Sequence, residues 1–116
     1  MHAESFRLTA ENAELIKSAK GRVIAVGTTS TRVLESVFRQ NGELRACEGQ
    51  TDIFIYPGFE FKVISGLITN FHLPRSTLLM LVSAFIGLEK TRELYRIAIE
   101  QNYRFYSFGD AMLLLP

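Results

Sequence analysis

Residues 21–42, GRVIAVGTTSTRVLESVFRQNG, join a strand signal directly to a helix signal. The run RVIAVG is short, rich in β-branched residues and bounded by glycines, which predicts a buried strand. The segment after it has apolar residues at helical spacing: Val33, Leu34, Val37 and Phe38. Its leading hydroxyl residues are suited to cap a helix, and Asn41 with Gly42 is suited to end it. The stretch therefore predicts a strand–helix unit.

The same alternation continues on both sides of this unit. The segment LTAENAELIKSAKG predicts a helix with Thr9 as its N-cap and Gly21 as its stop. The segment TDIFIYPG predicts a second strand that ends at Pro57 and Gly58, and FEFKVIS and LITNF predict further extended pieces. These elements extend the strand–helix pattern into the middle of the chain.

The last third of the chain contains two more helix signals and one strand signal. An apolar helix is predicted from Leu78 to Ile86, capped by the hydroxyls before it and ended by Gly87. EKTRELYRIAIEQN predicts an amphipathic helix, and YRFYSFGDAMLLLP predicts a strand with a Gly-Asp turn. We therefore expect one α/β domain over residues 1–116, with a layered mixed or mostly parallel sheet and flanking helices.

Composition limits the possible classes of protein. The 116 residues are 47% hydrophobic and 22% charged, which is typical of a globular domain. The longest apolar stretch is too short to span a membrane, and the N-terminus lacks a secretory signal pattern, so we expect no membrane partner. Cys47 is the only cysteine and suits a reducing cytoplasm. One cysteine and two distant histidines make a metal site a poor expectation.

Charge gives only a weak indication of a partner. The net charge is +1, without the basic excess that is typical of nucleic-acid-binding proteins. Six Lys/Arg against three Glu between Lys62 and Arg104 are compatible with phosphate contacts. They are equally compatible with a solvated helix face, and that alternative is the commoner one.

Two polar clusters precede helices and are candidate binding sites. Thr28 to Arg32 follow the first strand, and Asn70 to Thr77 precede the apolar helix. Because ligands of open α/β sheets bind beyond the carboxyl ends of strands, we expect both clusters, with Gly109 and Asp110, to share one rim. Backbone N–H groups at helix starts attract carboxylates and phosphates, and Arg32 and Arg75 would add charge-assisted hydrogen bonds. Simple helix capping is the alternative at each cluster.

Asn70 and His72 flank Phe71, so in an extended segment their side chains point to the same face. An imidazole beside an amide is suited to proton transfer or to recognition of a base. A structural histidine that bonds to the backbone is the open alternative.

Taken together, several segments resemble one known family. GRVIAVGTTSTRVLES, TDIFIYPGFEFKVISGLITNFHLPRSTLLMLVSAFIG and YRFYSFGDAML are similar to the closing blocks of the S-adenosylmethionine:tRNA ribosyltransferase-isomerase family of queuosine biosynthesis. MHAESFRL resembles an internal segment of that family. The resemblance covers nearly the whole chain but about the C-terminal third of a family member. It implies a C-terminal fragment of a longer enzyme, within a larger α/β barrel-like domain.

The resemblance also implies an activity. In this family S-adenosylmethionine is consumed as a ribosyl donor. Its ribosyl moiety is transferred to 7-aminomethyl-7-deazaguanine at the tRNA wobble position and isomerised, which gives epoxyqueuosine, adenine and methionine without a metal. The implied partners are S-adenosylmethionine, a tRNA that carries the precursor base, and the missing N-terminal part of the enzyme.

The family motifs point to candidate site residues as well, but they do not say which residue takes the proton. His72 is the first choice for the catalytic base, Glu4 or Asp110 is the next, and Asn70 accompanies His72. The residues expected to bind substrate are Thr28, Thr29, Arg32, Phe71, Arg75, Ser76, Thr77 and Arg104. Without the N-terminal blocks the fragment alone is expected to be inactive. The alternatives are a non-catalytic nucleotide- or anion-binding α/β module and a structural domain that packs on a partner.

Overall fold

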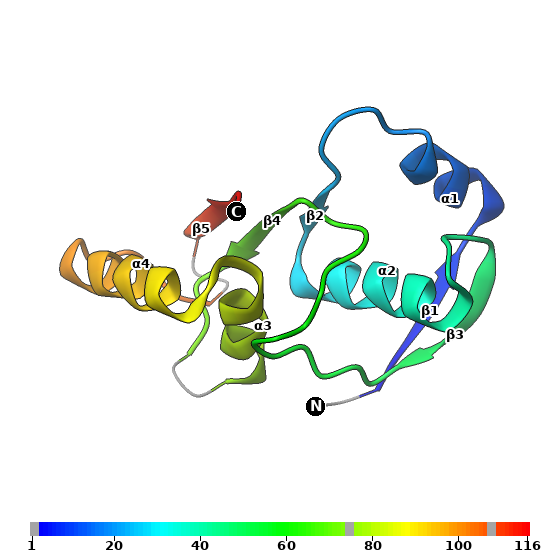
Figure 1. The fold of residues 1–116 in the computed structure, drawn as a ribbon. Helices are drawn as coiled ribbons and strands as arrows, with labels where there is room; N and C mark the ends of the chain where they lie inside the picture. The colour runs from blue at the N-terminus through cyan, green and yellow to red at the C-terminus, as the bar shows by residue number, and fades with distance from the viewer. Residues whose placement is uncertain (1–2, 74–75, 107–108) are drawn as a thin grey trace.

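The computed structural model describes residues 3–73, 76–106 and 109–116 (Figure 1). The elements within these ranges follow one another in chain order as β1 (Glu4–Leu8), α1 (Ala10–Lys17), β2 (Ile24–Val26), α2 (Thr28–Asn41), β3 (Cys47–Thr51), β4 (Gly66–Asn70), α3 (Thr77–Ile86), α4 (Leu88–Glu100) and β5 (Ala111–Leu114). Strands and helices are interspersed along the described chain, as the sequence predicts.

The described strands form two small sheets. In the three-stranded sheet, β4 lies in the centre, parallel to β2 and antiparallel to β5. In the other sheet, β1 and β3 form an antiparallel ribbon. The expected α/β class with a mixed sheet is therefore confirmed. The larger barrel-like domain that the resemblance implies stays a prediction.

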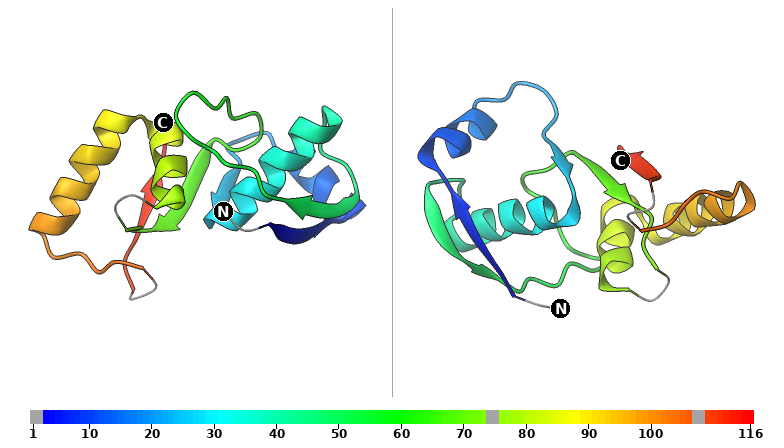
Figure 2. Two further views of the ribbon diagram at one scale, coloured as in Figure 1. Left: turned by 90° about the horizontal axis from the view of Figure 1, so that it is seen from below. Right: turned by 180° about the vertical axis from the view of Figure 1, so that it is seen from behind.

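Three apolar clusters hold these elements together. The largest lies between α3 and the three-stranded sheet, where Leu67, Leu81 and Val82 are almost completely buried. A second joins α1 and α2 to the ribbon through Ala13, Val37 and Leu8. A third packs α4 against the residues that follow β4. Figure 2 shows the consequence: α2 lies along the ribbon, and α4 projects on the opposite side of the molecule. The molecule is elongated, with extents of 44 × 31 × 27 Å.

Several helix boundaries follow the predicted signals. The Thr9 hydroxyl accepts a hydrogen bond from the Asn12 N–H at 3.1 Å, which confirms the N-cap of α1. Gly42 ends α2 with a positive φ of 75°, a conformation that glycine adopts without strain. The prediction of Gly21 as the end of α1 is wrong. The helix ends at Lys17 because the Ser18 hydroxyl bonds the carbonyl of Leu15 and closes the last turn.

The start of α2 differs from the expectation. Its N-cap is Gly27, with a φ of 93°, and no side chain caps the helix. The Gly27 N–H donates instead to the carbonyl of Ile68 on β4 at 2.8 Å. The prediction that hydroxyl residues cap this helix is therefore wrong, because the chain enters α2 through a glycine held by the neighbouring strand.

Two strand predictions are also wrong. Residues 52–56 form no strand, and β2 is not a buried strand, since Ile24 and Val26 are 42% and 67% exposed. Further along the chain, residues 62–64 also lie outside any strand, and they are held by the side chain of Glu35, which is 2% exposed. Its carboxylate accepts the backbone N–H groups of Lys62, Val63 and Ile64 at 2.8–3.0 Å. Those N–H groups are therefore satisfied without a strand partner.

Candidate functional site

A cavity of about 570 Å³ lies at the carboxyl ends of the parallel strands β2 and β4. Its polar lining comes from Thr28, Thr69, Asn70, His72 and Tyr106. This is the place where open α/β sheets bind ligands, because loops and helix starts converge there. The structure thus brings together parts of both polar clusters.

Thr28 is the first residue of α2 and comes directly after the Gly27 turn. Since α2 has no side-chain cap, its first N–H groups lack an acceptor from a side chain among the described residues. The helix dipole adds partial positive charge at the same point. This wall of the cavity can therefore accept an anionic group of a ligand.

Asn70 and His72 form the facing wall. Asn70 is exposed, while Phe71 between them is 4% exposed. This alternation matches the expectation that Asn70 and His72 point to one face, and both residues line the cavity. The amide and the imidazole therefore face the same volume.

His72 is fixed at two points. Its Nε2 lies 2.9 Å from the Thr69 hydroxyl, and its backbone N–H donates to the Tyr95 hydroxyl at 2.9 Å. Burial lowers the pKa of His72 below its ordinary value of 6.5. The imidazole is therefore neutral at pH 7 and can accept a proton. A neutral, oriented histidine that lines a cavity is suited to general base catalysis.

Tyr106 is a cavity residue that the sequence analysis did not identify. It lies within YRFYSF, at the start of the last segment predicted to form a strand. Phe105 does pack against Phe71 and Tyr95, whereas Tyr106 lines the cavity and is 44% exposed. Its N–H donates to the Phe71 carbonyl at 2.9 Å, and its φ of 61° is unusual for a tyrosine. In an extended segment neighbouring side chains point to opposite faces, so a partly buried Phe105 indicates that Tyr106 points outward.

Glu4 and Arg32 are brought together, but they do not line the cavity. Arg32 is 3% exposed, and its Nη1 lies 2.6 Å from the Glu4 carboxylate. Its Nε donates to the carbonyl of Ile53 at 3.2 Å. The pair therefore ties β1 to α2 and to the segment after β3. The structure does not support Arg32 as an anion ligand of this rim.

Asp110 and Arg104 form a second pair near the cavity. The Asp110 carboxylate accepts hydrogen bonds from the side chain and the backbone N–H of Arg104. The side-chain hydrogen bond is the main reason why the pKa of Asp110 is lowered. A carboxylate with a lowered pKa is a weak base, so this geometry disfavours Asp110 as the proton acceptor.

The remaining candidate residues lie away from the cavity lining. Phe71 is buried in the aromatic cluster with Tyr95. The Ser76 hydroxyl accepts the Leu79 N–H at 3.1 Å, which confirms it as the N-cap of α3. Thr29 and Thr77 lie in the first turns of α2 and α3 and are not among the lining residues. Arg75 lies outside the described residues.

Within residues 3–73, 76–106 and 109–116, no three His, Cys, Asp or Glu side chains are grouped so that they could hold a metal ion. No helix in the same ranges combines the length and the apolar character needed to cross a membrane.

Comparison with known proteins gives a consistent result. A family model described as queuosine biosynthesis protein matches residues 1–114. S-adenosylmethionine:tRNA ribosyltransferase-isomerases from Desulfitobacterium hafniense and Ralstonia pickettii are 58% and 59% identical to the chain, over 99% and 98% of its length. The chain spans about a third of these relatives, 35% and 33% of their lengths.

A solved structure agrees with these sequence matches. The crystal structure of the S-adenosylmethionine tRNA ribosyltransferase from Thermotoga maritima superimposes with a TM-score of 0.90 and 48% sequence identity. The match covers 96% of this chain and 40% of that chain. The fold described above is therefore also found within a longer chain.

Proposed function

Because the chain belongs to the queuosine biosynthesis protein family, we propose that it is the C-terminal part of an S-adenosylmethionine:tRNA ribosyltransferase-isomerase. The complete enzyme transfers the ribosyl moiety of S-adenosylmethionine to 7-aminomethyl-7-deazaguanine at the tRNA wobble position. The products are epoxyqueuosine in tRNA, adenine and methionine. A tRNA-modifying role of this kind belongs in the cytoplasm.

The observation that carries this proposal is the cavity between Thr28 and His72 at the ends of β2 and β4. We assign it to S-adenosylmethionine. The ligand's carboxylate would lie at the start of α2, where the Thr28 hydroxyl and the uncapped N–H groups can donate. Asn70 would orient the ribose from the facing wall.

His72 is the proposed base. A carbon next to the sulfonium loses a proton because the adjacent positive charge acidifies it. If the Nε2–H of His72 donates to the Thr69 hydroxyl, Nδ1 carries the lone pair that takes this proton. The bond between Tyr95 and the His72 backbone holds the imidazole in place while the proton moves.

A complete enzyme that contains these residues is needed to test the proposal. It can be the longer natural protein, or the Desulfitobacterium hafniense relative with this chain in place of the matching segment. We expect adenine release that depends on precursor tRNA, together with epoxyqueuosine detected by mass spectrometry of the tRNA. A folded complete enzyme that binds precursor tRNA but releases no adenine contradicts the proposal.

The alternative is a non-catalytic nucleotide- or anion-binding module, and the length of the chain favours it for the isolated piece. The chain spans only about a third of the matching relatives. We therefore expect the 116-residue chain alone to release no adenine from S-adenosylmethionine. Catalytic release by the purified chain would contradict this part of the proposal.

A further inference from the structure

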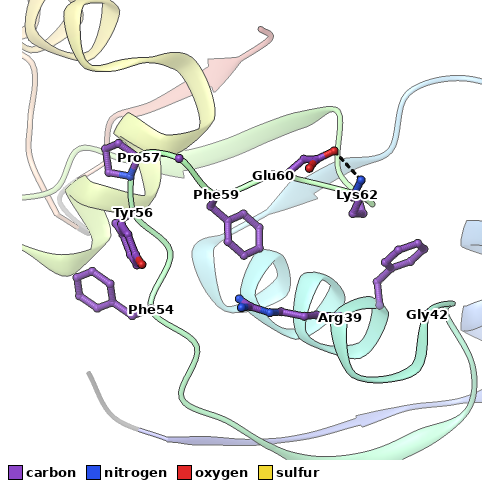
Figure 3. Close-up of a pocket in the computed structure, with 10 residues that line it drawn as sticks. Arg39, Gly42, Phe54, Tyr56, Pro57, Phe59, Glu60 and Lys62 are labelled. Carbon is purple, nitrogen blue, oxygen red and sulfur yellow. Dashed lines mark hydrogen bonds and ion pairs between the residues drawn. The ribbon is translucent and has the colours of Figure 1, made fainter.

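A second cavity, of about 610 Å³, lies beyond the opposite end of α2 (Figure 3). Phe38, Arg39 and Gly42 line it from the end of the helix, and the facing wall is the irregular segment from Phe54 to Lys62. At 1.5 Å per residue, about 16 Å of helix axis separates Arg39 from Thr28 in the first cavity. A ligand the size of one nucleotide cannot fill both cavities.

The second cavity presents exposed aromatic rings. Phe54 and Tyr56 are 42% and 55% exposed, and their ring centroids lie 5.5 Å apart. Phe59 lies opposite Arg39 and packs edge-on against Phe61. The planes of Phe54 and Tyr56 are tilted by 45°, so a flat ligand can stack on the face of one ring while it contacts the other ring at its edge.

The segment that carries these rings is fixed. Ile55, between the two exposed rings, is 1% exposed and belongs to the main core. The Phe59 N–H donates to the Tyr56 carbonyl at 3.0 Å and closes the turn at Gly58. Glu35 binds the backbone directly after this segment. The backbone that carries the rings is therefore held in position before any ligand arrives, which lowers the entropic cost of binding.

The charges around the cavity favour a ligand with phosphate. The Arg39 guanidinium lies 5.9 Å from the centre of the Phe59 ring. The Lys62 ammonium is paired with the Glu60 carboxylate at 2.6 Å. Two cations and one carboxylate leave an excess of one positive charge beside the rings. Aromatic platforms next to arginine are the usual surface for unpaired bases of single-stranded nucleic acid.

We propose that this second cavity binds an unpaired base of the RNA substrate, stacked on the Tyr56 ring and in contact with the Phe54 ring, with Arg39 near its phosphate. The inference rests on the proposed function, which supplies RNA as the substrate. A nucleotide here would neighbour the modified nucleotide, which reacts at the first cavity. The second cavity thus selects single-stranded over paired RNA.

The test measures RNA affinity without S-adenosylmethionine. A labelled single-stranded RNA oligonucleotide is titrated with the complete enzyme, and fluorescence anisotropy gives Kd. Tyr56→Ala and Phe54→Ala should each raise Kd about fivefold or more, since stacking on one aromatic contributes that much per base. Tyr56→Trp should stay within about twofold of the parent because it keeps a stacking face. Ile99→Ala, 63% exposed on α4, controls for the loss of exposed apolar surface.

Charge is tested separately. Arg39→Gln should reduce the slope of log Kd against log salt by about one, as expected for one phosphate contact. Arg92→Gln on α4 is the matched control and should leave the slope unchanged. Fully paired RNA should bind more weakly than the single strand, with a smaller effect of Tyr56→Ala. If free GMP displaced the labelled RNA as well as unlabelled single-stranded RNA does, RNA would not be the specific occupant of this cavity.

The outcomes separate this inference from the proposed function. Parent-like Kd values for both alanine variants would overturn the base site, whatever the enzyme's activity. If these variants kept the parent Kd but had a lower melting temperature, the two rings would contribute to protein packing and not to RNA binding. A third outcome is that the alanine variants weaken RNA binding while the parent enzyme itself releases no adenine. That outcome would support the base site and contradict the proposed transferase reaction.

Discussion

Helices α2 and α3 begin in different ways, although hydroxyl residues cluster at the start of both. At α3, Ser76 lies just before the first turn, and its side chain accepts the N–H of Leu79. At α2, the chain turns through Gly27 and no side chain caps the helix. Thr28, the first residue of this helix, lines a cavity. Similar residues thus close one helix start and leave the other open.

The comparison shows where each helix obtains its anchor. Helix α3 is fixed by its own cap and by the apolar residues Leu81, Val82 and Phe85. Helix α2 is fixed from its body, where Arg32 pairs with Glu4 and Glu35 binds backbone N–H groups. At its start, the Gly27 N–H donates to the Ile68 carbonyl on β4, so this end of α2 is held without a side-chain cap.

Glu35→Ala should have the largest effect on the body of α2. The substitution leaves three backbone N–H groups without their acceptor, two of them on Val63 and Ile64. We expect a loss of roughly 3 kcal/mol or more in the free energy of unfolding, measured by urea denaturation. Glu35→Gln, which keeps one oxygen acceptor, should lose less. A loss below about 1 kcal/mol for the alanine variant would mean that α2 is anchored elsewhere.

His72→Ala should have the next largest effect, on catalysis by the complete enzyme. Losing a general base lowers the chemical step by about 10²-fold or more. Single-turnover adenine release measures this step. The melting temperature of the variant serves as the control for folding, because His72 also bonds Thr69. If the single-turnover rate of the variant were within a few-fold of the parent rate, His72 would contribute to packing and would not be the base.

The sequence predicts elements whose signals are local and misses those held by distant partners. Ser76 and Gly87 bracket α3 within one short segment, and this helix was predicted correctly. The segment TDIFIY has β-branched and aromatic residues typical of a strand, yet it is an irregular wall of a cavity. The carbonyl of Ile53 in this segment accepts a hydrogen bond from Arg32, 21 residues away, and such a distant partner leaves no local pattern.

The same reasoning explains which site residues were predictable. Thr28, Asn70 and His72 come next to strand ends, so the rule for α/β sheets placed them together, and all three line one cavity. The ribbon was missed because β3, CEGQT, has no apolar alternation and is mostly exposed. Without the ribbon, the pairing of Glu4 with Arg32 could not be foreseen.

Ser76→Ala should have a smaller effect on stability than Glu35→Ala. Removing an N-cap acceptor costs about 1 kcal/mol, and the loss should appear in urea denaturation. Ser76→Asp retains an acceptor and should recover the parent stability. The affinity for S-adenosylmethionine should not change in either variant, because Ser76 does not line the cavity. If Ser76→Ala weakened the binding of S-adenosylmethionine, Ser76 would belong to the binding site as well as to the helix cap.

Thr28→Ala should have the smallest effect, and it tests the open helix start directly. The Thr28 hydroxyl has no hydrogen-bond partner among the described residues, so its removal should change the free energy of unfolding by less than about 0.5 kcal/mol. If the hydroxyl donates to the ligand's carboxylate, the affinity of the complete enzyme for S-adenosylmethionine should fall about threefold. Calorimetric titration measures that affinity, and Thr29→Ala, exposed and outside the cavity, is the matched control. If Thr28→Ala instead lost as much stability as Ser76→Ala, with unchanged affinity, the two helix starts would serve the same capping role.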